Sequence, residues 1–167
     1  MPDYTKTPAV IQSHWYNCWA AAMSWWTHAT AFRGIPALNE EDFLKEFPRN
    51  WDKNGAMSIQ GLTEIFNDQR FQMRARFSDV QDLDRIIIRL QNDAVLRMDA
   101  FPIVIGYRDE RAGGNHLAVL CGFDAETSVP QKFITMDPAR GFVTRDRDYF
   151  ASQRMIYAWD TRAGDII

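Results

Sequence analysis

Cysteine and histidine are scarce in this sequence, and long apolar runs are missing. Two cysteines and three histidines occur in 167 residues, and their spacing does not match the paired ligands of zinc sites. We therefore expect no disulfide framework, no metal site and no cofactor. No apolar run approaches the roughly 20 residues that cross a bilayer, so no contact with a membrane is expected.

An excess of charge of one sign is missing as well. The formal net charge is −3 and the pI is about 5.6, with both signs interspersed and no basic stripe that would neutralise phosphates. We expect no nucleic-acid partner. The first residues lack the basic and apolar regions of a classical signal peptide. We therefore expect a soluble protein, which a specialised secretion system would have to deliver if it leaves a bacterial cell for a target cytoplasm.

Length and composition favour one domain that spans residues 1–167. Hydrophobic residues make up 46% of the chain, which is enough to bury a sizeable core without cross-links. The sequence contains no repeat, low-complexity segment or linker that would divide it.

The stretch from about Cys18 to Arg97 is predicted to be mainly helical. A first helix starts at Cys18 and ends near Phe32. Three further helices are predicted in NEEDFLKEF, SIQGLTEIFNDQ and DLDRIIIRLQND, and Asn39 and Ser58 are suitable N-caps for the first two of these. Apolar side chains recur at helical spacing in the last helix and are assigned to the core: Leu83, Ile86, Ile87 and Leu90.

After Met98 the pattern changes to short strands. PIVIGY and NHLAVLCGF are predicted to pair as a hairpin around a polar turn, and KFITMD, GFVTR and RMIYAWD supply three more strands. RDYFASQ, between the last two, is predicted to be a brief helix or loop. The predicted fold class is therefore α+β, with an N-terminal helical layer that carries the nucleophile, packed on a C-terminal antiparallel β-sheet, and a cleft between them.

Cys18 is the candidate nucleophile. It opens the run CWAAA, which places its thiol at the start of a helix, where a neighbouring imidazolium would favour the reactive thiolate. Gln12 lies six positions upstream, and its side-chain amide can join the backbone N–H of Cys18 to form an oxyanion hole. The alternative is a buried cysteine that only packs at the start of an apolar helix.

His116 is the preferred general base. His28 lies about three turns, roughly 15 Å, along the first helix and cannot reach Cys18, and His14 lies in the preceding loop with no regular element to hold it. His116 lies on the predicted strand NHLAVLCGF, where Cys121 faces the opposite side, so we expect Cys121 in the core. A core histidine without a catalytic role is the alternative for His116.

Asp137 is the preferred acid to orient His116. It follows the strand KFITM and precedes Pro138, so its carboxylate lies at a strand end where the chain turns. Asp124 is the rival, but an extended strand would carry it about 25 Å away from His116. An aspartate that only forms the turn is the alternative for Asp137.

Taken together, these residues resemble the papain-like clan of cysteine peptidases. The resemblance rests on the order Gln12, Cys18, His116 and Asp137 and on the segments CWAAA, GGNHLAV and ITMDPARG. The short length and ITMDPARG are most similar to the bacterial double-glycine leader peptidases, whereas CWAAA resembles papain and the papain-like effector proteases of bacteria. The chain has Trp19 where leader peptidases usually have glycine, and Asp137 where papain has asparagine.

The resemblance implies a papain-like fold and a cysteine endopeptidase that cleaves a protein or peptide substrate. It implies a catalytic triad of Cys18, His116 and Asp137, with Gln12 in the oxyanion hole. Trp15 and Trp19 flank the nucleophile and are candidate substrate contacts. Their bulk would narrow the site, as in double-glycine leader peptidases, and favour cleavage after a Gly-Gly pair.

The expected context is a bacterial toxin or effector that an immunity or inhibitor protein restrains in the producing cell. Two other functions remain open at this point. The same residues suit a glutamine deamidase or an acyltransferase, and an inactive relative could serve as a peptide-binding module. A redox pair of Cys18 and Cys121 is not expected, because their helix and strand positions do not bring them together.

Overall fold

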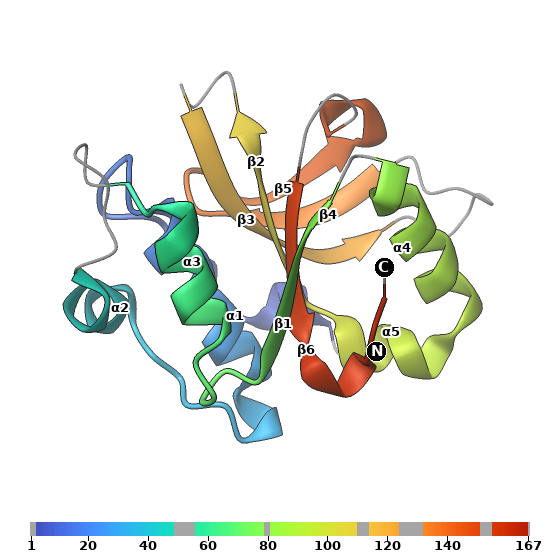
Figure 1. Ribbon diagram of the computed structural model, residues 1–167. Coiled ribbons are helices and arrows are strands. Elements are labelled where there is room, and N and C mark those ends of the chain that lie inside the picture. The colour runs from blue at the N-terminus through green and yellow to red at the C-terminus, as the bar shows by residue number, and fades with distance from the viewer. Residues whose placement is uncertain are drawn as a thin grey trace.

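A six-stranded antiparallel sheet forms the centre of the structure, in the strand order β1-β6-β2-β3-β4-β5 (Figure 1). The computed structural model describes residues 3–48, 56–78, 81–109, 114–123, 132–150 and 155–166. The strands are β1 (Met73–Ser78), β2 (Ile103–Asp109), β3 (Gly114–Phe123), β4 (Lys132–Asp137), β5 (Gly141–Asp146) and β6 (Met155–Asp160).

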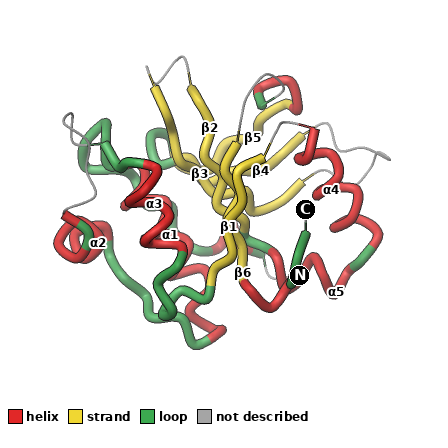
Figure 2. The backbone as a smooth tube through the Cα atoms, in the orientation of Figure 1, coloured by secondary structure: helices red, strands yellow, loops and turns green. Residues whose placement is uncertain are grey.

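Helices flank this sheet on two sides (Figures 1 and 2). On one side lie α1 (Cys18–Thr30), α2 (Glu40–Glu46) and α3 (Ile59–Phe66), and on the other lie α4 (Gln81–Asn92) and α5 (Ala94–Ala100). Short 3-10 helices cover Tyr4–Lys6, Ala31–Arg33, Arg147–Tyr149 and Thr161–Ala163. The predicted α+β fold, with the helix of Cys18 packed on the sheet, is confirmed, whereas the position of α4 and α5 opposite that layer was not predicted.

Capping side chains fix where several helices begin. The hydroxyl of Ser58 accepts the N–H of Gly61 at 3.0 Å, and the N–H of Asn39 donates to the carboxylate of Asp42 at 2.9 Å. Asp93 accepts the N–H of Leu96 at 2.9 Å and thereby starts α5 as a helix separate from α4. These contacts satisfy N–H groups that have no partner inside the helix. None of the described helices is long and apolar enough to span a bilayer.

All five predicted strands are present, and β2 and β3 form the predicted hairpin, with Tyr107 opposite His116. RDYFASQ begins with a 3-10 helix, as predicted, and its last three residues lie outside the described part of the chain. The prediction was wrong over β1, which lies inside the stretch expected to be helical. β1 is an edge strand with exposed Arg74 and Arg76. Its sequence MRARFS alternates apolar and polar residues, as a half-buried strand does, and the prediction did not use this signal. β1 forms by pairing with β6, far along the chain.

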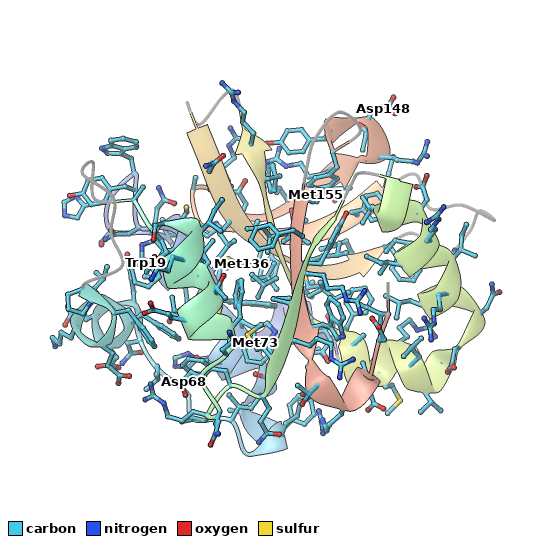
Figure 3. The ribbon with its side chains drawn as sticks, in the orientation of Figure 1. Trp19, Asp68, Met73, Met136, Asp148 and Met155 are labelled. Atoms are coloured by element: carbon cyan, nitrogen blue, oxygen red, sulfur yellow. The ribbon has the colours of Figure 1, made fainter. Side chains whose placement is uncertain are left out.

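The core lies between the sheet and its helices. The predicted apolar stripe of α4 is fully buried, as are the indoles of Trp25, Trp26 and Trp159. Trp26 donates its indole N–H to the carbonyl of Pro102 at 2.9 Å, which joins α1 to the segment before β2. Figure 3 shows Met136 of β4 within the packed interior, where it is fully buried.

A buried arginine joins the end of α1 to elements on the other side of the molecule. The side chain of Arg33 is 2% exposed and forms an ion pair of 3.2 Å with the buried carboxylate of Asp160, at the end of β6. Its guanidinium also donates to the carbonyls of Met98 at 2.7 Å and Phe101 at 2.6 Å, at the end of α5. Arg33 therefore satisfies several acceptors, among them the buried carboxylate of Asp160 and the carbonyl of buried Phe101.

Replacing Arg33 with methionine is expected to lower the free energy of unfolding by about 3–5 kcal/mol, because the variant leaves buried acceptors without their donor. Chemical denaturation of the purified variant measures this loss. Arg162→Met is the matched control, because Arg162 pairs with the same carboxylate but its side chain is 45% exposed. Its loss should be about 1 kcal/mol or less. Equal losses in the two variants would contradict the structural role of Arg33.

Candidate active site

Cys18 is the first residue of α1, and its side chain is buried. Asn17 precedes the helix, and its carbonyl accepts the N–H of Ala21 at 3.1 Å, which closes the first turn. The unpaired N–H groups of this turn and the helix dipole place a positive potential beside the sulfur.

Strand β3 holds His116 beside Cys18. The ring of His116 is buried, and its Nε2 lies 3.0 Å from Oδ1 of Asp137. That contact occupies one ring nitrogen, and the side chain of Cys18 lies close enough to the imidazole to raise its pKa. Tyr107 packs edge to face against the imidazole, with ring centroids 5.7 Å apart. The ring is therefore held between its two polar partners.

Asp137 is the last residue of β4, and its carboxylate is buried. Besides His116, Oδ1 accepts the N–H of Ala139 at 2.9 Å, and Oδ2 accepts from Nη2 of Arg145 at 2.7 Å. Asp124, the rival acid, lies outside the described residues. The structure thus brings Cys18, His116 and Asp137 together in the order that a thiol, base and acid require.

The electrostatic environment favours the charged forms of both His116 and Asp137. Burial alone would lower the pKa of His116, but its contacts with Asp137 and Cys18 raise it to about 9. Burial would raise the pKa of Asp137, but His116, the N–H of Ala139 and Arg145 lower it to about 2. At neutral pH the site therefore holds an imidazolium beside the thiol and a carboxylate behind the imidazolium.

Gln12 lies on a segment that is fastened to the turn after Asp137. The N–H of Gln12 donates to the carbonyl of Pro138 at 2.8 Å. Gly141, at the end of this turn, has a φ of +79°, and a Cβ built there would lie 3.7 Å from the Cβ of Ala9. Among the described residues, the buried Oε1 of Gln12 has no hydrogen-bond partner. The backbone of Gln12 is therefore anchored, while its side-chain oxygen is not used to hold the fold.

A polar clamp that the sequence did not predict fixes the loop between Gln12 and Cys18. The N–H and hydroxyl of Ser13 donate to the carboxylate of Glu40 at 3.0 and 2.9 Å, and Nδ2 of Asn17 donates to the hydroxyl of Ser13 at 3.0 Å. Glu40 belongs to the first turn of α2, where the sequence indicated only a favourable charge for the helix. No local pattern relates a serine to a carboxylate on another element.

The two predicted substrate contacts differ in exposure. Trp15 is 70% exposed and packs edge to face on Tyr16, with ring centroids 5.4 Å apart. Trp19 is 2% exposed and lies in the core on the α1–α3 side of the sheet (Figure 3). The structure therefore leaves Trp15 at the surface and buries Trp19.

The remaining cysteine and histidines lie apart from this constellation. Cys121 is buried, its Sγ donates to the carbonyl of Ile134 at 3.3 Å, and burial raises the pKa of its thiol to about 12. His28 is exposed, with Nδ1 2.8 Å from the carbonyl of Ser24, and His14 stacks on Tyr16. Within the described ranges, no group of three or more histidine, cysteine or acidic side chains is placed to hold a metal ion.

Comparison with known proteins identifies the fold. No protein-family model and no curated protein matches the sequence. Among solved structures, the chain is similar to a double-glycine-motif protease from an AMS/PCAT transporter, whose crystal structure contains the leader peptide. The TM-score is 0.55 at 17% sequence identity, over 91% of this chain and 89% of that one. The papain-like fold that the sequence resemblance implied is therefore confirmed.

Iodoacetamide at pH 6.5 is expected to alkylate Cys18 rapidly and to leave Cys121 unmodified in the folded protein. His116→Gln should slow the alkylation of Cys18 by about 10-fold or more, because a thiol without an imidazolium is mostly protonated at this pH. Mass spectrometry of tryptic peptides over time measures both rates.

His28→Gln serves as the control for this experiment, since His28 lies on the same helix but outside the site. Unchanged labelling of Cys18 in His116→Gln, or equal labelling of the two cysteines, would show that His116 does not activate this thiol.

Proposed function

We propose that this protein is a cysteine endopeptidase with Cys18 as nucleophile, His116 as general base and acid, and Asp137 as the residue that orients His116. The observation that carries the proposal is the buried contact of 3.0 Å between Asp137 and Nε2 of His116, an imidazole that also interacts with a cysteine at a helix N-terminus. Such an arrangement is suited to a thiolate–imidazolium pair.

The proposed reaction proceeds through an acyl-enzyme. The thiolate of Cys18 attacks the peptide carbonyl, and the oxyanion that forms accepts hydrogen bonds from the backbone N–H of Cys18 and the side-chain amide of Gln12. His116 donates its proton to the leaving amine as the C–N bond breaks, which leaves a thioester. His116 then takes a proton from water, which attacks the thioester and releases a new carboxyl terminus and the free thiol.

The proposed substrate is a protein or peptide segment with a Gly-Gly pair before the scissile bond. A similar solved structure is that of a double-glycine-motif protease with a bound leader peptide, which supports a peptide ligand for this fold. In this proposal Trp15, which is exposed and lies three positions before Cys18, limits the room for side chains next to the cleaved bond, and glycine has no side chain to clash with it. Trp15 is thus the proposed substrate contact on this chain.

The proposal extends to a role as a bacterial toxin or effector that an immunity protein restrains, and this context remains a prediction from the family resemblance. Glutamine deamidation and acyl transfer need the same thiol, base and oxyanion hole, since only the leaving group or the acceptor differs. An inactive peptide-binding module would not need a thiol held against an imidazolium.

Incubation of the active protein with a bacterial lysate is expected to create new N-termini that follow Gly-Gly in the parent sequences. Cys18→Ala should create none, and Cys121→Ala, which changes the other thiol, should retain cleavage. Mass spectrometry of labelled N-termini identifies the products. Conversion of glutamine to glutamate without chain scission would establish the deamidase instead, and bulky residues before the cut would refute the Gly-Gly specificity.

Gln12→Ala is expected to lower kcat by about 10²–10³-fold, because an oxyanion donor acts on the transition state. Its main-chain bond to Pro138 is retained in this variant, so the segment should stay in place. The rate of Cys18 alkylation should not change, since the amide does not ionise the thiol. A loss of alkylation equal to the loss of turnover would assign Gln12 to the fold and not to catalysis.

A further inference from the structure

The carboxylate of Asp137 is divided between two cationic side chains. Oδ1 faces Nε2 of His116 at 3.0 Å, and Oδ2 faces Nη2 of Arg145 at 2.7 Å. The side chain of Arg145 is 11% exposed, so it has little contact with solvent and offers little surface to a substrate. We propose that Arg145 is a positioning residue of the triad, which orients the carboxylate of Asp137 and balances its charge. This inference rests on the proposed function.

The reach of Arg145 explains why an arginine suits this position. Its backbone lies on β5 opposite Phe133, several residues before Asp137 on β4, so the side chain has to extend along the sheet to meet the carboxylate. The guanidinium lies over the ring of Tyr149, 4.3 Å from the centroid. This contact holds the planar group in place, which a flexible ammonium would not reproduce.

A second route of contacts links Arg145 to the catalytic histidine. Tyr149 packs edge to face on Tyr107, with centroids 5.8 Å apart, and Tyr107 packs edge to face on His116 at 5.7 Å. Together with Asp137, these residues close a ring of contacts from Arg145 to His116 and back. If the guanidinium moved, the imidazole would therefore move as well, because the carboxylate and the two tyrosines both connect them.

The charges of the site show what Arg145 contributes. In the thiolate–imidazolium form that the proposed function requires, Cys18, His116 and Asp137 together carry one negative charge in a buried space, and the guanidinium cancels it. An uncompensated buried charge is costly. The four charged groups lie on α1, β3, β4 and β5. Tyr107 of β2 packs on the imidazole, and Tyr149 of the 3-10 helix Arg147–Tyr149 packs on the guanidinium. Burial raises the pKa of Tyr107, so this hydroxyl stays neutral.

Loss of the guanidinium charge has a defined effect on ionisation in the site. Without the guanidinium, the site has one positive charge fewer and retains protons more strongly. The thiol of Cys18 is then favoured over its thiolate, and the imidazolium of His116 is favoured over the neutral imidazole. Both limbs of a pH profile that reports the thiolate–imidazolium pair should therefore move to higher pH. A residue that only stabilised the fold would change the amount of folded protein and leave this profile in place.

The test compares the wild type with Arg145→Met, which removes the charge at similar length, and Arg145→Lys, which keeps a charge without the planar fork. The rate of Cys18 alkylation is measured from pH 4 to 10, so that this readout needs no substrate. In Arg145→Met we expect the profile to move up by about one pH unit. In Arg145→Lys the profile should stay near that of the wild type.

Turnover gives the second readout once a cleaved substrate is available. Arg145→Met should lower kcat by about 10–10²-fold at nearly unchanged KM, since the carboxylate is misplaced but no substrate contact is lost. Arg145→Lys should recover part of kcat. Arg140→Met is the matched control, because Arg140 is an exposed arginine on the β4–β5 turn. It should change neither the alkylation profile nor kcat.

The outcomes separate this inference from the proposed function. A shifted alkylation profile in Arg145→Met, in a protein without peptidase turnover, would support the positioning role and reject the peptidase. An unshifted profile in folded Arg145→Met, or an equal shift in Arg140→Met, would overturn the positioning role. Should Arg145→Met not fold, Arg145→Gln replaces it with the same expected shift. Failure of both to fold would also overturn the inference, because Arg145 would then be an anchor of the fold.

Discussion

The buried carboxylate of Asp137 is the constraint on which the rest of the site depends. An ionised group without water needs several donors, and three supply them here: the imidazole on β3, the guanidinium on β5 and the N–H of Ala139 in the following turn. The same turn offers the carbonyl of Pro138 to the segment of Gln12. Satisfying one carboxylate therefore fixes His116, Arg145 and the segment of Gln12 relative to one another, although they come from distant parts of the chain.

Local environment, and not residue type, separates the two cysteines. Cys18 lies at a helix N-terminus with the ring of His116 as its neighbour. Cys121 lies within β3, and burial raises the pKa of its thiol to about 12. Trp15 and Trp19 differ in exposure for the same reason. Trp19 lies on α1 and is buried in the core, whereas Trp15 lies in the loop before the helix and is exposed.

The shared fold carries less functional information than the site does. A TM-score of 0.55 at 17% identity to a double-glycine-motif protease means that the layout of helices and strands is similar while most side chains differ. A papain-like scaffold can support hydrolysis, deamidation or acyl transfer, because these reactions share a thiol nucleophile and an oxyanion hole. The proposed peptidase activity therefore depends on the contacts among the side chains around Cys18, and not on the fold.

Features set by short-range patterns could be predicted from the sequence alone. The start of α1 at Cys18, the helix caps at Ser58 and Asn39, the buried stripe of α4 and the five C-terminal strands all depend on residues a few positions apart. The sequence also determined the residues Gln12, Cys18, His116 and Asp137 as candidates, because their order and flanking segments are distinctive. Tertiary structure alone decided the pairing of β1 with β6, the burial of Trp19, the clamp of Ser13 on Glu40 and the choice of Arg145 over other arginines as the partner of Asp137. Each of these depends on a neighbour that chain folding brings close, and the periodicity of a local segment carries no information about which distant side chain that will be.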